Sequence, residues 1–223
     1  MATVYAQYDG VVQRTSQSSW YNARAAISGT YAQNLASIAT SAVAATVTAT
    51  RGGGSAYNIY RAFFHFDTSG VSGTIDNATF KVRGVGGITG DLIALKAKAG
   101  ISTLSTIDYG NIFGWSVAGV NGSGGCDLED AVTKYSGEIS TWSSTGYNDI
   151  TLNDQAKSDM SSDNDFYVAL VNFDYDLKDQ APTDHLGVNG MYFENNTGTS
   201  KDPYIDYEVA VSANNATFYG SNF

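Results

Sequence analysis

The residues with the greatest chemical potential lie in the stretch 60–67, which reads YRAFFHFD. If this stretch is a β-strand, side chains alternate between its two faces, and Phe64 and Phe66 are predicted to face the core. The other face then carries Arg61, Phe63, His65 and Asp67. An arginine and a histidine on one sheet face fit three roles. They could form a polar ladder on a solvated sheet, bind an acidic sugar, or, with His65 as the base, cleave a polysaccharide. We favour the polar ladder.

Two carboxylates, Asp174 and Asp176, lie two residues apart at the end of a second strong strand pattern, 165–176. The interpretation that we favour is a turn cluster, because the polar sequence LKDQAPTD follows directly. The first alternative is a calcium site completed by a backbone carbonyl, since calcium prefers oxygen ligands. The second is a pair of carboxylates for glycoside hydrolysis.

Three tryptophans lie outside the strong strand patterns, and two of them, Trp115 and Trp142, belong to the second half of the chain. Tryptophans in the loops of a β-sandwich either fill space under those loops or offer stacking surfaces for sugars. We favour the first role. If the chain binds a glycan, the candidate contacts are Trp115 and Trp142 together with Arg61 and His65.

Several kinds of enzyme site are absent from the sequence. His65 and His185 are the only histidines, and the chain contains no G-x-S-x-G, H-E-x-x-H, P-loop or dinucleotide-binding motif. Cys126 is the only cysteine, which excludes an internal disulfide and the four-cysteine metal sites. We therefore expect a protein that is not an enzyme and needs no cofactor, with calcium as the one candidate ion.

The charge and hydropathy of the chain limit its partners. The 223 residues carry a net charge of −10, which disfavours nucleic acid. Residues 1–100 have a net charge of +4 and residues 101–223 a net charge of −14. The acidic half is either a solvated surface or a docking face for a basic partner. No apolar run approaches the roughly 20 residues of a membrane span, and the first residues lack the features of a signal peptide.

Alternation with a period of two dominates the hydrophobic pattern. Strand patterns recur between Gly-rich turns, and one short helix is predicted at 154–160, capped by Asn153. This arrangement predicts an all-β fold, an antiparallel two-sheet jelly-roll β-sandwich with one or two short rim helices. We expect a single domain over 1–211. The tail 212–223 either frays or forms an arm that packs on a neighbouring subunit through Phe218, Tyr219 and Phe223.

The stretch 60–84, YRAFFHFDTSGVSGTIDNATFKVRG, resembles a strand–turn–strand signature of the DNRLRE-type jelly-roll domains, which are akin to some carbohydrate-binding modules. The matching residues are Arg61, Phe64, Phe66, Asp67, Ser69, Ile75, Ala78, Thr79 and Phe80. The later segments WSSTGYNDITLNDQAKSDM and KDPYIDYEV also look like parts of that family. The resemblance implies a jelly roll of two antiparallel sheets. Such domains occur as glycan-binding or spacer modules in secreted bacterial proteins and as parts of phage virions.

These observations lead to one expected function and two alternatives. A jelly roll without an export signal fits a bacteriophage structural protein, made in the host cytoplasm and released in the virion by lysis. It would be a capsid decoration (cement) protein or a fibre or tail component, and its partners would be copies of itself and other virion proteins. The alternative is a carbohydrate-binding module for a cell-surface or algal polysaccharide. A polysaccharide lyase or hydrolase is the least favoured function.

Overall fold

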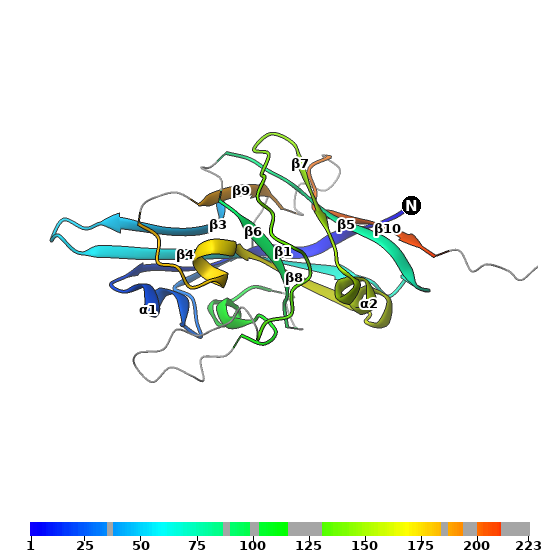
Figure 1. Ribbon diagram of the computed structural model, residues 1–223, viewed down its shortest axis with the longest axis horizontal. Coiled ribbons are helices and arrows are strands. Elements are labelled where there is room, and N and C mark those ends of the chain that lie inside the picture. The colour runs from blue at the N-terminus through cyan, green and yellow to red at the C-terminus, as the bar shows by residue number, and fades with distance from the viewer. Residues whose placement is uncertain are drawn as a thin grey trace, which may run out of the picture.

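The strands of the chain form an antiparallel β-sandwich of two sheets (Figure 1). The computed structural model describes residues 1–34, 38–86, 90–98, 103–115, 131–183, 187–193 and 200–210. Its elements are β1 (Ala2–Gln17), α1 (Trp20–Arg24), β2 (Tyr31–Asn34), β3 (Ile38–Ala49), β4 (Ser55–Asp67), β5 (Ile75–Arg83), β6 (Leu92–Lys96), η1 (Thr106–Gly110), β7 (Tyr147–Thr151), α2 (Asp154–Ser162), β8 (Asp165–Asn172), η2 (Phe173–Leu177), β9 (Val188–Tyr192) and β10 (Tyr204–Val209). η1 is a 3-10 helix and η2 is a single π-helical turn.

The long strand β1 belongs to both sheets. Its first residues pair with β10, and this sheet continues to β5 and β7; we call it sheet A. From Ala6 onward, β1 lies between β2 and β4 in the second sheet, sheet B. The other edge of β4 pairs with β3 along its first half and with β8 along its second half, and β9 and β6 extend these two branches. All these pairings are antiparallel, which confirms the predicted jelly-roll sandwich.

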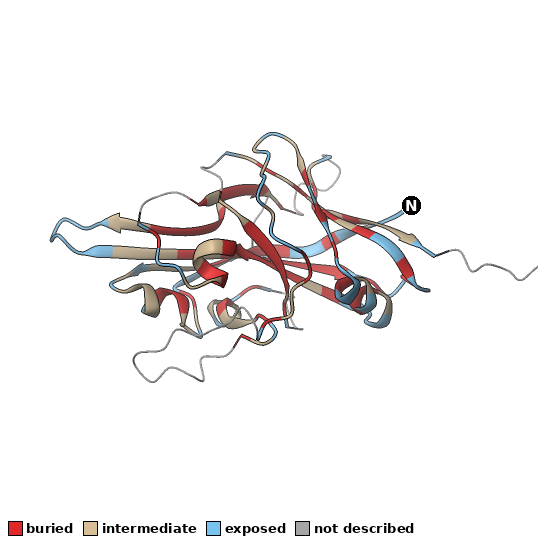
Figure 2. Ribbon diagram, viewed as in Figure 1, coloured by how far each residue is buried: buried red, intermediate tan, exposed pale blue. Residues whose placement is uncertain are grey.

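The main core lies between the two sheets, where Figure 2 shows buried residues along the strands. Phe64 and Phe66 of β4 project into this core and are fully buried, as predicted. Their rings lie 5.1 Å and 5.5 Å from the ring of Phe80 on β5, both in edge-on geometry. At the end of β4, the Asp67 carboxylate accepts a hydrogen bond from the backbone amide of Ser69 at 2.9 Å, which holds the turn that follows the strand.

A second core covers the outer face of sheet B. It joins Ile59 and Phe63 of β4 to side chains from α1, η1 and η2, which lie over the sheet as an outer layer. Arg61 is completely buried beneath this layer, whereas His65, 6% exposed, is flanked by the rings of Tyr8 and Tyr167 of sheet B itself. The face that these residues share is as predicted, but the solvated polar ladder is wrong because Arg61 and His65 are both buried. A period of two shows which side chains share a face and does not show what packs against that face.

The described helices are short and lie outside the two sheets (Figure 1). α2 begins where the sequence predicted, after Asn153, whose side-chain oxygen accepts a hydrogen bond from the backbone amide of Ala156 at 3.0 Å. With nine residues, α2 is the longest of these helices. None of the helices in the described ranges is therefore long and apolar enough to cross a lipid bilayer.

Truncating the central aromatic cluster tests the inward face of β4. We expect Phe66→Ala to lower the free energy of unfolding by about 3–5 kcal/mol, because it removes a fully buried ring and leaves a cavity. Phe113→Ala is the matched control, since Phe113 is 50% exposed and should cost clearly less. Chemical denaturation measures both values. A loss under about 1 kcal/mol for Phe66→Ala would show that Phe66 does not fill the core.

Candidate binding pocket

Arg61 and Asp176 form a buried ion pair beneath the outer layer of sheet B. The Arg61 Nε and NH2 groups donate to the two Asp176 carboxylate oxygens at 2.7 Å and 2.8 Å, so the contact is bidentate. The guanidinium lies between two rings, 4.0 Å from the centre of Tyr109 and 3.8 Å from that of Trp115. Its NH1 group donates to the backbone carbonyl of Tyr109 at 2.7 Å. Arg61 thus links strand β4, on which it lies, to η1 through Tyr109 and to η2 through Asp176.

A second buried arginine, Arg24 at the end of α1, extends this cluster. It donates to the backbone carbonyls of Asp176 and Leu177 at 2.5 Å and 3.0 Å. Its NH1 group lies 3.3 Å from one carboxylate oxygen of Asp179, and the other oxygen of Asp179 accepts a hydrogen bond from the Trp20 indole at 2.9 Å. We call Arg24, Arg61, Tyr109, Trp115 and Asp176 the arginine cluster. Its hydrogen bonds and ring contacts tie α1 and η2 to sheet B.

The arginine cluster contains three of the six residues that the sequence proposed as glycan or calcium ligands, namely Arg61, Trp115 and Asp176. Arg61 and Trp115 do meet, but both are buried, so neither offers an open surface to a sugar. A calcium ion at Asp176 would have to displace Arg61, and Asp174 is paired with Lys178 at 3.6 Å. Within the described ranges, no three His, Cys, Asp or Glu side chains gather as a metal site.

Trp142 lies apart from the other candidates. It is half-buried against the main core, close to Gly84 at the end of β5. It therefore does not share a site with His65. The remaining candidates cannot be placed, because His185, Phe218, Tyr219 and Phe223 lie outside the described residues.

His65 stands in a row of three rings across sheet B. Strand register places it opposite Tyr8 of β1 and Tyr167 of β8. Its ring stacks on both, with centroids 5.6 Å from Tyr8 and 4.7 Å from Tyr167. The His65 Nε2 atom is 2.8 Å from a carboxylate oxygen of Asp165, and the buried Nδ1 atom has no hydrogen-bond partner among the described residues. A ring enclosed in this way is better suited to positioning its neighbours than to transferring a substrate proton.

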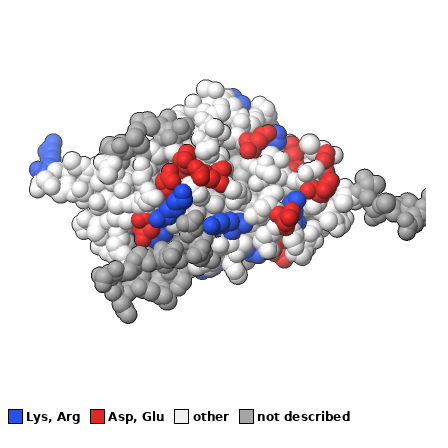
Figure 3. Space-filling model, in the orientation of Figure 1, with Lys and Arg blue, Asp and Glu red and all other residues white. Residues whose placement is uncertain are grey.

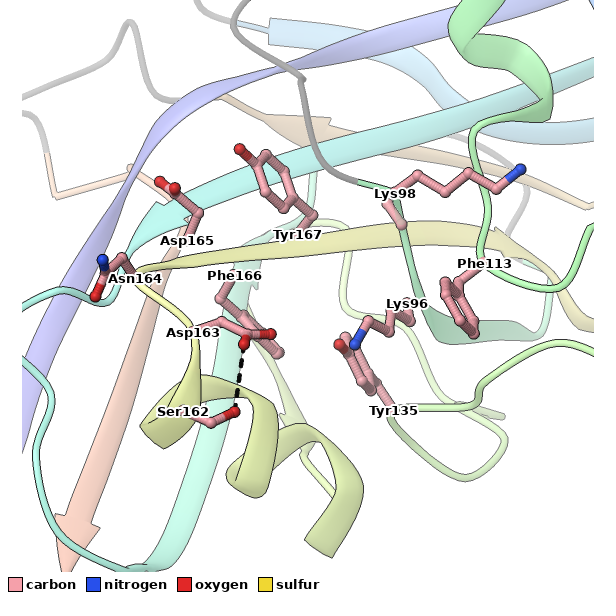
Figure 4. A pocket seen from close by; sticks show the side chains of 11 residues that line it. Lys96, Lys98, Phe113, Tyr135, Ser162, Asp163, Asn164, Asp165, Phe166 and Tyr167 are labelled. Atoms are coloured by element: carbon pink, nitrogen blue, oxygen red, sulfur yellow. Dashed lines mark hydrogen bonds between the residues drawn. The ribbon is translucent and has the colours of Figure 1, made fainter.

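A pocket of about 630 Å³ opens beside this row, and two of its walls come from residues that His65 contacts (Figure 4). It is lined by Lys96, Ala97, Lys98, Phe113, Tyr135, Ser162, Asp163, Asn164, Asp165, Phe166 and Tyr167. We call it the Tyr167 pocket. The segment after α2 supplies one side, β8 supplies Tyr167, and the chain after η1 supplies Phe113 on the opposite side (Figure 4).

The inner wall of the Tyr167 pocket contains a hydrogen-bonded group around Asp159 of α2. Lys96, Tyr135 and Gln155 donate to its carboxylate at 2.8 Å, 2.6 Å and 2.9 Å. Burial by itself raises the pKa of Asp159, but the hydrogen bonds from Lys96 and Tyr135 outweigh it and hold the pKa below its usual range. Burial, followed by the Asp159 carboxylate, raises the pKa of Tyr135. Near neutral pH, Asp159 therefore stays charged, and its carboxylate balances the positive charge of Lys96 in an ion pair.

The sequence-based analysis found only His65 of this site. It missed Asp163, Asn164, Asp165 and Tyr167, although Asp165 and Tyr167 are two residues apart and so share a strand face. That spacing was the one sequence feature that could have indicated the site. It is common in strands, so it did not distinguish these residues from others. Comparison of the chain with protein-family models and with curated proteins found no match to either. The pocket is therefore interpreted from its own geometry.

Removing one member of the buried ion pair tests the arginine cluster. We expect Asp176→Ala to lower the free energy of unfolding by about 3–5 kcal/mol, because it leaves two arginines buried without their shared carboxylate. Asp174→Ala is the matched control two residues away. Its pair with Lys178 is solvent-exposed, so its removal should cost about 1 kcal/mol or less. Equal losses in urea denaturation of the two variants would contradict a supporting role for the cluster.

Proposed function

We propose that this protein is a non-enzymatic structural protein of a bacteriophage virion, which assembles with copies of itself and with other virion proteins. The jelly-roll fold supports the proposal, since viral capsid proteins use this architecture, although lectin domains use it too. The composition supports it as well. Charged residues make up 15% of the chain, and a surface with few charges suits close contact between subunits better than a highly charged one.

The observation that carries the assembly role is a pair of exposed isoleucines on the outer layer of sheet B. Ile27 is 68% exposed and Ile107 is 73% exposed. Their segments lie side by side, because the amide of Gly29 donates to the carbonyl of Thr106 at 2.7 Å. Large aliphatic side chains that share an exposed region are typical of surfaces that become buried in an assembly.

Surface charge offers a second kind of contact. Acidic side chains gather in patches on the face shown in Figure 3. In the described part of the chain, Glu138 lies near Asp91 and Asp174, and its pKa is raised, first by loss of solvent and then by the Asp91 carboxylate. A basic surface that docks here would offset the repulsion that the neighbouring carboxylates exert on Glu138. An acidic patch of this kind favours a basic partner within the virion.

The virion assignment is tested most directly by mass spectrometry of purified virions of the phage that encodes the chain. We expect the protein at a copy number comparable to that of other structural proteins, because a decoration, fibre or tail component is present in many copies. Peptides from a host cytoplasmic protein serve as the control for contamination. Absence of the chain from clean virions would rule out this function.

Self-assembly is tested separately with the two isoleucines. We expect the purified protein to sediment as a species larger than its 23.6 kDa chain, and Ile27→Ser/Ile107→Ser to shift it towards the monomer. Val209→Ser is the control, because Val209 is also exposed but lies on sheet A. Analytical ultracentrifugation reports the mass, and circular dichroism shows that each variant is folded. A wild-type protein that stays monomeric, or a double variant that assembles normally, excludes this surface as the contact.

A further inference from the structure

We infer that the Tyr167 pocket binds a dipolar ligand, an amino acid or short peptide that carries both an ammonium and a carboxylate group. This inference goes beyond the proposed structural role and does not depend on it. The pocket has the size of a small-molecule site, since about 630 Å³ falls within the usual range of roughly 300–1,000 Å³. The feature that selects the ligand is the charge of the lining, in which the two signs come from separate segments of the chain.

The negative charges of the pocket belong to Asp163 and Asp165, where the chain passes from α2 into β8. One oxygen of the Asp165 carboxylate lies 2.8 Å from His65 Nε2, which positions this side chain while 55% of it stays exposed. Asp163 is exposed as well. An ammonium group at this side of the pocket would meet two carboxylates and the side-chain carbonyl of Asn164, all of which accept hydrogen bonds.

The positive charges belong to Lys96, the last residue of β6, and to Lys98. The Lys96 Nζ atom lies 2.8 Å from the Asp159 carboxylate, and the side chain is 26% exposed. Because a lysine ammonium donates through more than one N–H, Lys96 can bind a ligand carboxylate and keep its contact with Asp159. Lys98 is exposed, and Figure 4 shows it on the opposite side of the opening from Asp163 and Asp165.

The aromatic rings of Tyr167 and Phe113 form the apolar part of the lining. The Tyr167 ring stacks on His65 with a centroid distance of 4.7 Å, which restricts its orientation. Phe113 is 50% exposed, and the Lys96 ammonium lies 5.4 Å from the centre of its ring. An apolar wall therefore adjoins the positive side of the pocket. An apolar side chain of the ligand would cover ring surface that is otherwise in contact with water.

Ligands of the simpler charge classes leave part of this lining unsatisfied. Two lysines and two aspartates balance one another in the lining, so an anion meets the aspartates and a cation meets the lysines. An uncharged ligand takes water away from these ionised groups without offering an opposite charge to any of them. A dipolar ligand places an opposite charge at each side, and that distinguishes it from uncharged ligands of the same size.

The test is isothermal titration calorimetry with phenylalanine and glycyl-phenylalanine. Each is used in four forms: unmodified, N-acetylated, C-terminally amidated, and blocked at both ends. The four forms keep the same aromatic side chain and differ in charge. For the better binder of the two, we expect the unmodified form to bind at least about tenfold more tightly than its blocked forms, because each block removes a charge-assisted contact.

Charge variants of the protein show which side of the pocket holds which group. Asp163→Asn should weaken binding of the unmodified ligand by about threefold or more, and should not weaken the N-acetylated form, which has no ammonium. Lys98→Gln should weaken the unmodified ligand and should not weaken the amidated form, which has no carboxylate. Asp149→Asn is the matched control, because Asp149 is an exposed aspartate on β7 outside the pocket. Circular dichroism melting shows that each variant is folded.

Two results would contradict the inference. Binding of the doubly blocked form as tight as that of the unmodified form, or tighter binding of a singly blocked form, would overturn the ligand class. No binding of any form of either compound would overturn the site. None of these outcomes bears on whether the protein is found in virions.

Discussion

The bidentate pair of Arg61 and Asp176 is the interaction on which the outer half of the structure depends. A buried charge is unfavourable unless a partner and hydrogen bonds satisfy it, so each of these side chains is confined to the one place where the other lies. The rings of Tyr109 and Trp115 cover both faces of the guanidinium. Segments that are distant in sequence, from α1 to η2, are thereby held against sheet B. Without that cover, the second core under the outer layer would be exposed to water.

Strand β4 links this cluster to the Tyr167 pocket. Its even alternation sends Phe64 and Phe66 into the main core, and Arg61, Phe63 and His65 to the other face. One rigid strand therefore carries a residue of the arginine cluster and, four residues later, the histidine that orients two walls of the pocket. Because both faces of β4 are packed, His65 has little freedom to move. A pocket placed beside such a strand is organised before any ligand arrives, which reduces the entropy lost on binding.

The proposed assembly surface and the Tyr167 pocket use different parts of the molecule. The exposed isoleucines belong to the outer layer around α1 and η1, whereas the pocket lies where α2 meets β8. A jelly roll is suited to this division, because its sheets form a stable scaffold while the loops and strand ends vary.

The sequence by itself determined the local features of this protein. Period-two alternation identified the strands and the inward residues Phe64 and Phe66, and side-chain chemistry identified the cap at Asn153. These features depend on residues close together in the chain. The tertiary structure alone decided that Arg61 meets Asp176, 115 residues away, and that His65 meets Asp165, 100 residues away. Alternation defines the two faces of a strand, but what covers a face depends on where distant segments pack. For that reason Arg61 and Asp176 suggested exposed ligands in the sequence and became a buried ion pair in the fold.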